Sequence, residues 1–281
     1  MNKLIKEIRL MAQMNQEQFA NALGTTPLSV NRWENGKTVP NNMAQMQLFE
    51  FCKERNIDLF SYVVEQVRYK DDKELFVLYH GSKKGIVGNI RPISSAYCDF
   101  GKGFYMGTDP AQPLTLVCDE KAPQFYTISA NLTGLKILNV EVGLDWALMI
   151  AYYRGYMDAY KDTDIYQKYA HMADGYDMIV GYIANDRMYK VMTRFFDKEI
   201  TDEALLHSLS VLDLGKQYVA INQKACDQIK ILAQRPLNKL ELKILEEKSI
   251  QRREEGIALT EDILVKYRRK GKFFDEIMRG E

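Results

Sequence analysis

The sequence predicts an α+β protein in which a small all-helical domain precedes a mixed α/β domain and a charged helical extension. Three observations support this class. Residues 1–68 show helical periodicity almost throughout, residues 75–235 alternate short apolar runs with helical segments, and residues 236–281 carry Lys, Arg and Glu at helical spacing. The stretch 68–74 contains too few glycines and prolines to form a long flexible linker.

The N-terminal region divides into several short helices. Apolar residues at three- and four-residue steps predict an amphipathic first helix. Asn15 is suited to cap a second helix that Gly24 ends. Thr26 and Pro27 then open a third helix as cap and first helical residue, and this helix ends at Asn35-Gly36. Further helices are expected near 43–54 and 59–67.

The middle region predicts strands where aromatic and aliphatic residues form short runs. These strands are expected at 75–79, 124–130, 136–140, 178–180 and 217–221. Helices are expected near 145–160 and 203–208, separated by irregular segments that carry function. The extension is expected to form two helices, 239–255 and 260–278, packed as a solvated hairpin on the main domain.

Composition excludes several protein classes. The chain is 281 residues long, 46% apolar and 27% charged with zero net charge, which excludes disorder and a generally nucleic-acid-attracting surface. It has no run near the ~20 apolar residues of a membrane span and no secretory signal, so a cytoplasmic protein is expected. Metal binding is not expected, because the four cysteines and three histidines lack zinc spacing. The cysteines, expected to be free thiols, are Cys52, Cys98, Cys118 and Cys226.

The segment from Asn15 to Lys37 has the helix, glycine-bearing turn and helix that place a second helix in the DNA major groove. Over about residues 1–58 it resembles phage-repressor (XRE-type) helix-turn-helix domains, including the ending Trp33-Glu34-Asn35-Gly36-Lys37. The resemblance implies DNA contacts by Gln16, Thr26, Pro27, Leu28, Asn31, Arg32, Asn35 and Lys37.

These residues divide by the part of DNA they would contact. Gln16, Asn35 and Lys37 are placed at the phosphate backbone, and the others at base edges or sugar. Arg32 can bind a guanine bidentately, the commonest specific contact. Leu28 either meets a thymine methyl group or packs against the main domain. Two further residues, Val30 and Trp33, are expected in the core.

The N-terminal region is only weakly basic. Residues 1–70 contain nine Lys or Arg against seven Asp or Glu, so one copy would bind DNA poorly and a homodimer is expected. The alternative is that the helix-turn-helix serves as a protein-interaction surface.

Two motifs of the main domain carry a second resemblance. Tyr79-His80-Gly81-Ser82 follows a predicted strand, and Phe100-Gly101-Lys102-Gly103-Phe104-Tyr105 follows it by a few dozen residues. A lone histidine is more often structural than functional, and the second motif is not a phosphate-binding P-loop. It resembles the "FGKGIYF" segment of poly(ADP-ribose) polymerase-type ADP-ribosyltransferases, in which a strand-end "HG" occurs at the same spacing.

That resemblance implies NAD as a substrate. Tyr105 would stack on the nicotinamide ring, the backbone of Gly81 would bind its amide, and His80 would orient the adenosine ribose, with Ser82 adding a hydrogen bond. The implied catalytic set is His80, Tyr105 and Gln217, and the NAD-binding set is His80, Gly81, Ser82 and Tyr105.

The sequence departs from that family at two places. Gln217 stands where the family has a glutamate, so the amide keeps a hydrogen bond to the ribose and loses the charge and the base. Residues 114–117 lack the expected second aromatic. The resemblance covers about 75–235, and a related bacterial group shares "LYHGS", "DFGKGFY" and "QYV" with this chain.

The leading hypothesis is therefore an NAD-dependent mono-ADP-ribosyltransferase joined to a sequence-specific DNA-binding domain, with an unidentified protein or nucleic-acid acceptor. The pairing suggests a toxin or phage-defence role by association only. One alternative is a non-catalytic, NAD-sensing transcription regulator. Another is an interaction protein whose two domains only dock partners.

Overall fold

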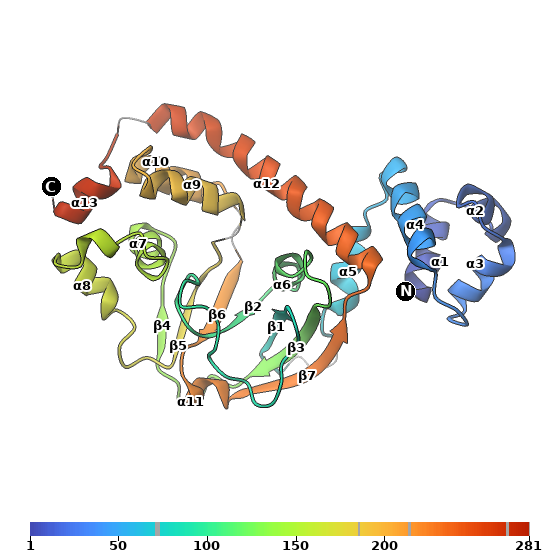
Figure 1. Ribbon diagram of the computed structural model, residues 1–281, viewed down its shortest axis with the longest axis horizontal. Coiled ribbons are helices and arrows are strands. Elements are labelled where there is room, and N and C mark those ends of the chain that lie inside the picture. Colours follow the sequence, from blue (N-terminus) through green and yellow to red (C-terminus); the bar gives the residue numbers. More distant parts are fainter. Residues whose placement is uncertain (71–73, 185, 213–214, 268–269, 281) are drawn as a thin grey trace.

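The computed structural model describes residues 1–70, 74–184, 186–212, 215–267 and 270–280. An N-terminal helical part lies at one end of the molecule, and a seven-stranded mixed sheet with attached helices forms the rest (Figure 1). This arrangement confirms the predicted α+β class. Within the described residues, no helix is both long and apolar enough to cross a lipid bilayer.

The N-terminal helices begin where the sequence supplies caps. They are α1 (Asn2–Met11), α2 (Gln16–Ala22), α3 (Pro27–Glu34), α4 (Asn42–Glu54) and α5 (Leu59–Val67). The Asn15 side chain accepts the backbone N–H of Gln18, whose side chain accepts the N–H of Asn15 in return. The Thr26 hydroxyl caps α3 by accepting the backbone N–H of Ser29. Val30 and Trp33 are buried, as predicted.

The sheet has the order β4-β5-β6-β2-β1-β3-β7, and among the described strand pairs only β4–β5 is parallel. Its strands are β1 (Val77–Ser82), β2 (Phe104–Gly107), β3 (Gln124–Ala130), β4 (Ile137–Asn139), β5 (Met178–Tyr182), β6 (Lys216–Ala220) and β7 (Ile229–Pro236). Strands β2 and β7 were not predicted. Strand β2 is only four residues long, and most side chains of the edge strand β7 are exposed, so β7 has no alternating burial.

Helices cover one face of the sheet. Phe100 and Val219 belong to a core with the helices α7 (Leu144–Tyr153), α9 (Asp186–Phe196) and α10 (Asp202–Ser210). The opposite face packs around Leu78, Phe104 and Tyr126. Shorter elements complete the fold: α6 (Ala111–Leu116), the 3-10 helix η1 (Asp158–Tyr160), α8 (Asp164–Ala170) and α11 (Gln223–Cys226).

Two helix predictions were wrong in extent. The helix expected over 145–160 ends at Tyr153, because Gly155 takes a φ of 84°. The expected C-terminal hairpin is instead one 29-residue helix, α12 (Lys239–Tyr267), followed by α13 (Phe274–Arg279). The break expected near 256–259 does not occur, because Gly256 is buried within the helix and its carbonyl oxygen accepts the Thr260 hydroxyl.

Helix α12 packs on both parts of the molecule (Figure 1). Its first half contacts α4, α5 and α6, where Leu240, Ile244 and Leu245 join one core with the N-terminal helices. Its second half contacts α9 and α10. The extension therefore packs on the N-terminal helices as well as on the main domain, and it presents different buried faces along its length.

A buried amide ties α4 to the start of α12. The Gln45 Nε2 donates to the Pro40 carbonyl oxygen at 2.8 Å, and its Oε1 accepts the backbone N–H of Leu240 at 3.2 Å. We expect Gln45→Ala to lower the free energy of unfolding by about 1–3 kcal/mol, because it leaves both buried backbone groups without a partner. Urea denaturation measures this change. Gln47→Ala, at an exposed position of the same helix, is the control and should change stability little; equal effects would contradict the assignment.

Candidate functional site

Near the middle of the sheet, the facing edges of β1 (residues 80–82) and β2 (residues 104–106) do not form a ladder, and we call this unpaired stretch the opening. In the described part of the chain, the two strands share one residue pair, Tyr79 with Gly107. Strand β1 nevertheless pairs with β3 along its whole length, and β2 pairs with β6 along its whole length. The sheet thus consists of two half-sheets whose strands pair at one position, and the facing edges of residues 80–82 and 104–106 lie outside the β1–β2 ladder.

The backbone of Gly81 faces this opening. The Ala130 N–H donates to the Phe76 carbonyl oxygen at 3.0 Å, so residue 76 points its polar backbone groups toward β3. The register continues without irregularity from Val77 to Ser82, and backbone groups alternate in direction along an antiparallel strand. The N–H and C=O of Gly81 therefore point away from β3, toward β2.

Close packing against α6 also requires glycine at position 81. A Cβ atom there would lie 2.5 Å from the Pro113 carbonyl oxygen, so α6 packs directly on this residue. The glycine thus serves close packing as well as leaving its backbone accessible.

His80 closes part of the opening. Its Nδ1 lies 2.7 Å from the Tyr105 carbonyl oxygen, and its ring stacks on Phe104 at 4.3 Å between centroids. Burial lowers the pKa of His80 more than the hydrogen bond to Tyr105 raises it. The neutral ring then donates from Nδ1 and leaves Nε2 as an acceptor.

Tyr105 is fixed by its hydroxyl group. The oxygen accepts the Phe100 N–H at 3.0 Å and donates to the Gly101 carbonyl at 2.7 Å. Burial raises the pKa of Tyr105, so the phenol stays protonated. Gly101 has a φ of 70°, and a Cβ on it would lie 2.7 Å from the ring of Tyr153. The ring orientation of Tyr105 is therefore set by a tightly packed loop.

Gln217 is buried and its amide group is engaged. The Nε2 donates to the Asp99 Oδ2 at 3.1 Å and to the Tyr182 carbonyl oxygen at 2.9 Å. Asp99 is also buried: its Oδ1 accepts the Arg154 Nε at 3.1 Å, and its Oδ2 accepts the Ala184 N–H at 3.2 Å. The buried carboxylate beside position 217 thus comes from Asp99.

Asp99 and Arg154 were not predicted from the sequence as site residues. Asp99 opens the Asp-Phe-Gly-Lys-Gly-Phe-Tyr segment, so an acidic residue that begins a glycine-rich motif was the available signal. Arg154 gave none, because its pairing with Asp99 is a long-range contact.

The structure divides the predicted catalytic residues between the two faces of the sheet. Tyr105 contacts the helix-covered core, and its cross-strand partner is Val219. Gln217 lies on the same face as Tyr105, because it is two residues from Val219 along β6 and side chains alternate in direction along a strand. His80 projects to the opposite face, against Phe104. The three residues therefore surround the opening and do not form one side-chain cluster.

Glycines make room around Gln217. Both cross-strand neighbours, Gly107 and Gly181, lack side chains. A Cβ on Gly107 would lie 2.6 Å from Gln112 Oε1, and one on Gly181 would lie 2.6 Å from the ring of Phe100. The Gln112 amide and the Phe100 ring thus occupy the space beside this strand position.

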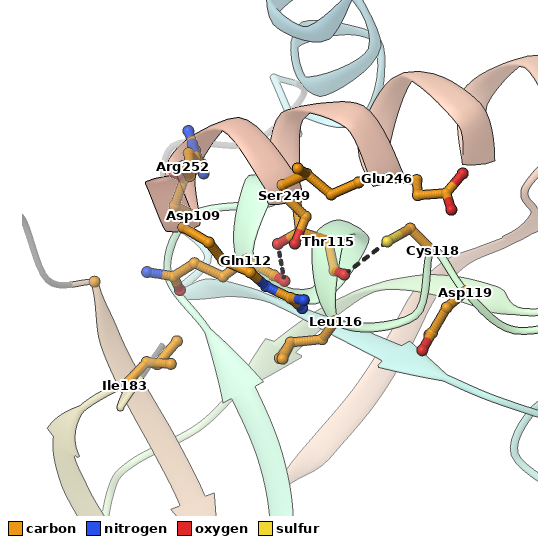
Figure 2. Close-up of a pocket in the computed structure, with 13 residues that line it drawn as sticks. Asp109, Gln112, Thr115, Leu116, Cys118, Asp119, Ile183, Glu246, Ser249 and Arg252 are labelled. Carbon is orange, nitrogen blue, oxygen red and sulfur yellow. Dashed lines mark hydrogen bonds between the residues drawn. The ribbon is translucent and has the colours of Figure 1, made fainter. Parts of the chain in front are cut away.

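A cavity of about 610 Å³ lies between α6 and α12, at the end of β2 and β6 nearest Gln217. Figure 2 shows Glu246, Ser249 and Arg252 of α12 on one side and residues of α6 and its flanks on the other. Leu116, which lines the cavity, lies in the segment where the second aromatic was expected. In the described ranges, no group of three or more His, Cys, Asp or Glu is arranged to hold a metal ion, and all four cysteines are free.

The predicted DNA-contacting residues lie on and around α3, at the far end from the sheet (Figure 1). The exposed members are Thr26, Pro27, Leu28, Arg32, Asn35 and Lys37. Leu28 is 59% exposed, so packing against the main domain, the alternative raised for it, does not occur.

The other two predicted residues are half-buried and join a polar cluster. Gln16 donates to Glu34 at 2.7 Å and accepts from Asn31 at 3.3 Å, and Glu34 pairs with Arg9 at 2.6 Å. Burial raises the pKa of Glu34, but the hydrogen bonds from Arg9 and Gln16 lower it by more. The pKa is therefore below its usual value and the carboxylate stays ionised. These hydrogen bonds join α2 to α3 and hold the side chain of Gln16 in one orientation.

His80 gives the site a pH dependence. Because the pKa of His80 is lowered in the fold, the unfolded chain takes up this proton first as pH falls. We expect this contribution to stability to be complete above about pH 6.5 and to be lost as pH falls below it. His80→Gln keeps a donor for the Tyr105 carbonyl. In this variant, the free energy of unfolding measured by urea denaturation should fall less as pH is lowered. His171→Gln, at an exposed histidine, is the control; an unchanged pH profile in His80→Gln would refute the assignment.

Comparison with known families agrees with two regions of the structure. A family model described as helix-turn-helix (HTH_3) matches residues 5–43, which contain α2 and α3. A model described as "Protein of unknown function (DUF3990)" matches residues 76–231, more than half of the chain. No curated protein and no solved structure gives a significant match. The chain therefore belongs to the DUF3990 family and carries an N-terminal helix-turn-helix DNA-binding domain.

Proposed function

We propose that this protein is an NAD-dependent mono-ADP-ribosyltransferase coupled to a sequence-specific DNA-binding domain. The observation that carries the proposal is the opening between β1 and β2, into which Gly81 directs an N–H donor and a C=O acceptor. The nicotinamide carboxamide has one acceptor and one donor group, which matches this pair. In a fully paired sheet, both backbone groups of Gly81 would be hydrogen-bonded to the neighbouring strand.

The other residues around the opening suit the rest of NAD. The fixed ring of Tyr105 offers a flat apolar surface to the nicotinamide ring. The neutral His80 has Nε2 available to accept a ribose hydroxyl, and Ser82 follows on the same strand. Gln217 keeps its Oε1 as an acceptor for a hydroxyl, because in the described residues both hydrogen bonds of its amide use Nε2. These side chains fit a ligand that carries an aromatic ring and sugar hydroxyl groups.

The proposed reaction breaks the bond between nicotinamide and ribose and forms a new bond from the ribose to an acceptor nucleophile. Nicotinamide leaves as a neutral molecule and the acceptor loses a proton. An amide at position 217 cannot accept that proton, and loss of general-base assistance typically costs a factor of about 10²–10⁴ in rate. A slow single transfer to a protein or nucleic-acid acceptor follows, in preference to chain elongation.

A second function, an NAD-sensing transcription regulator, is favoured by one observation. Helix α12 lines the cavity near Gln217 and also packs on α4 and α5 of the DNA-binding end. A ligand there would contact an element that both parts share. Incubation with labelled NAD distinguishes the two functions. Release of nicotinamide with label transfer to protein, DNA or RNA supports the transferase, and tight NAD binding without turnover supports the regulator.

NAD should stabilise the folded protein, by about 2.7 kcal/mol at a hundredfold excess over the dissociation constant. Tyr105→Ala and His80→Ala should each abolish the NAD-dependent rise in Tm, measured from each variant's own Tm without ligand. Tyr97→Ala is the matched control, because Tyr97 is 71% exposed in the neighbouring loop. A full thermal shift in both site variants would place the NAD site elsewhere.

We propose that the helix-turn-helix binds DNA as a homodimer, with Arg32 at a base edge and Lys37 at a phosphate. Arg32→Ala should weaken binding by about 1–3 kcal/mol and relax sequence preference at one position. Lys37→Ala should weaken binding to all sequences alike and reduce its salt dependence. Binding titrations on operator-like and random duplexes measure both effects, with Lys266→Ala at the far end of α12 as control. Sequence-independent losses from both variants would remove Arg32 from base reading.

A further inference from the structure

The orientation of the Gln217 amide is determined by its neighbours. A carboxylate oxygen of Asp99 and the carbonyl oxygen of Tyr182 lie 3.1 and 2.9 Å from Nε2. Both groups are acceptors, so only the NH₂ end of the amide can face them. In the described part of the chain, no protein donor binds the Oε1 of Gln217. Asp99 therefore holds the amide with its oxygen available for a ligand.

The same contact supplies negative charge. Asp99 is buried at 7% exposure and lies one hydrogen bond behind Gln217. An amide that donates to a carboxylate is polarised, which makes its own oxygen a stronger acceptor. The Arg154 guanidinium pairs with the other carboxylate oxygen and keeps the anion fixed in this buried position.

We infer that Asp99 is the positioning residue of the site, orienting and polarising Gln217 so that the pair replaces a single carboxylate. This inference rests on the proposed function. It explains how a glutamine can stand at this position, because a glutamate there would place two carboxylates within hydrogen-bonding distance in a buried site. Such a pair cannot remain doubly ionised without cost.

A charge exchange between the two positions tests the inference. The variants are Asp99→Asn, Gln217→Glu and the double variant that combines both substitutions. The control is Asp177→Asn, which removes another buried carboxylate, one paired with Lys224 and outside the hydrogen-bond network of Gln217. All are measured as full-length protein for urea stability, NAD binding and nicotinamide release from the folded fraction.

Asp99→Asn should lower kcat by about 10²-fold with KM for NAD changed far less, because preorganised charge acts on the transition state. Asp177→Asn should lower stability and leave kcat unchanged. Gln217→Glu should be less stable than wild type, and its deficit should shrink as pH falls from about 8 to about 5. The deficit shrinks because the two crowded carboxylates bind a proton more readily in the folded than in the unfolded state, so lower pH stabilises the folded variant.

The double variant should be more stable than Gln217→Glu, because the amide introduced at position 99 can donate to the carboxylate introduced at position 217. The Tyr182 carbonyl oxygen still opposes that carboxylate, so stability should not return fully to the wild-type value. Nicotinamide release should recover to at least the wild-type rate.

Three outcomes count against the inference or the function on which it rests. Additive stability losses, with no pH dependence in Gln217→Glu, would overturn the pairing. An unchanged kcat in Asp99→Asn would overturn the positioning role. If wild type neither binds nor cleaves NAD, the proposed function fails, and the double-variant cycle in stability still decides the Asp99–Gln217 coupling.

Discussion

The candidate site depends on one constraint: within the residues that the structure describes, the two half-sheets pair only at Tyr79 with Gly107. Beyond this pair the strands β1 and β2 keep their outer partners, β3 and β6, but do not pair with each other. Unpaired buried backbone groups are costly, so a sheet retains such an edge only where another group satisfies it. Here His80 supplies one partner by bonding the Tyr105 carbonyl oxygen, and Gly81 is left facing the opening.

The loop before β2 is organised by the buried carboxylate of Asp99, which pairs with the half-buried Arg154. Asp99 collects hydrogen bonds from Arg154, Ala184 and Gln217, which lie far apart in the sequence. The neighbouring backbone of Phe100 and Gly101 then fixes the Tyr105 hydroxyl. One carboxylate thus aligns both the aromatic ring and the amide that flank the opening. Glycine is required at position 101 because its φ is 70° and a Cβ would lie 2.7 Å from the Tyr153 ring.

Helix α12 connects the N-terminal helices to the helices that pack on the sheet. Its first turn is anchored to α4 through Gln45 and Leu240, and the exposed pair Lys53–Glu247 at 2.5 Å adds a second link. Farther along, the same helix forms a wall of the cavity beside α6 and then packs on α9 and α10. The N-terminal helices and the helices around the sheet therefore share one packing partner, α12 (Figure 1).

The sequence by itself determined the local features. Capping residues such as Asn15 and Thr26 fixed the N-terminal helices, and the apolar runs located five of the seven strands, because both depend on neighbouring residues. Tertiary structure alone decided the single join between the half-sheets and the separation of His80 from Tyr105 across the sheet. It also decided the Asp99 contact of Gln217 and the continuity of α12 through Gly256. These features depend on contacts between distant segments, whose register and burial no local pattern specifies.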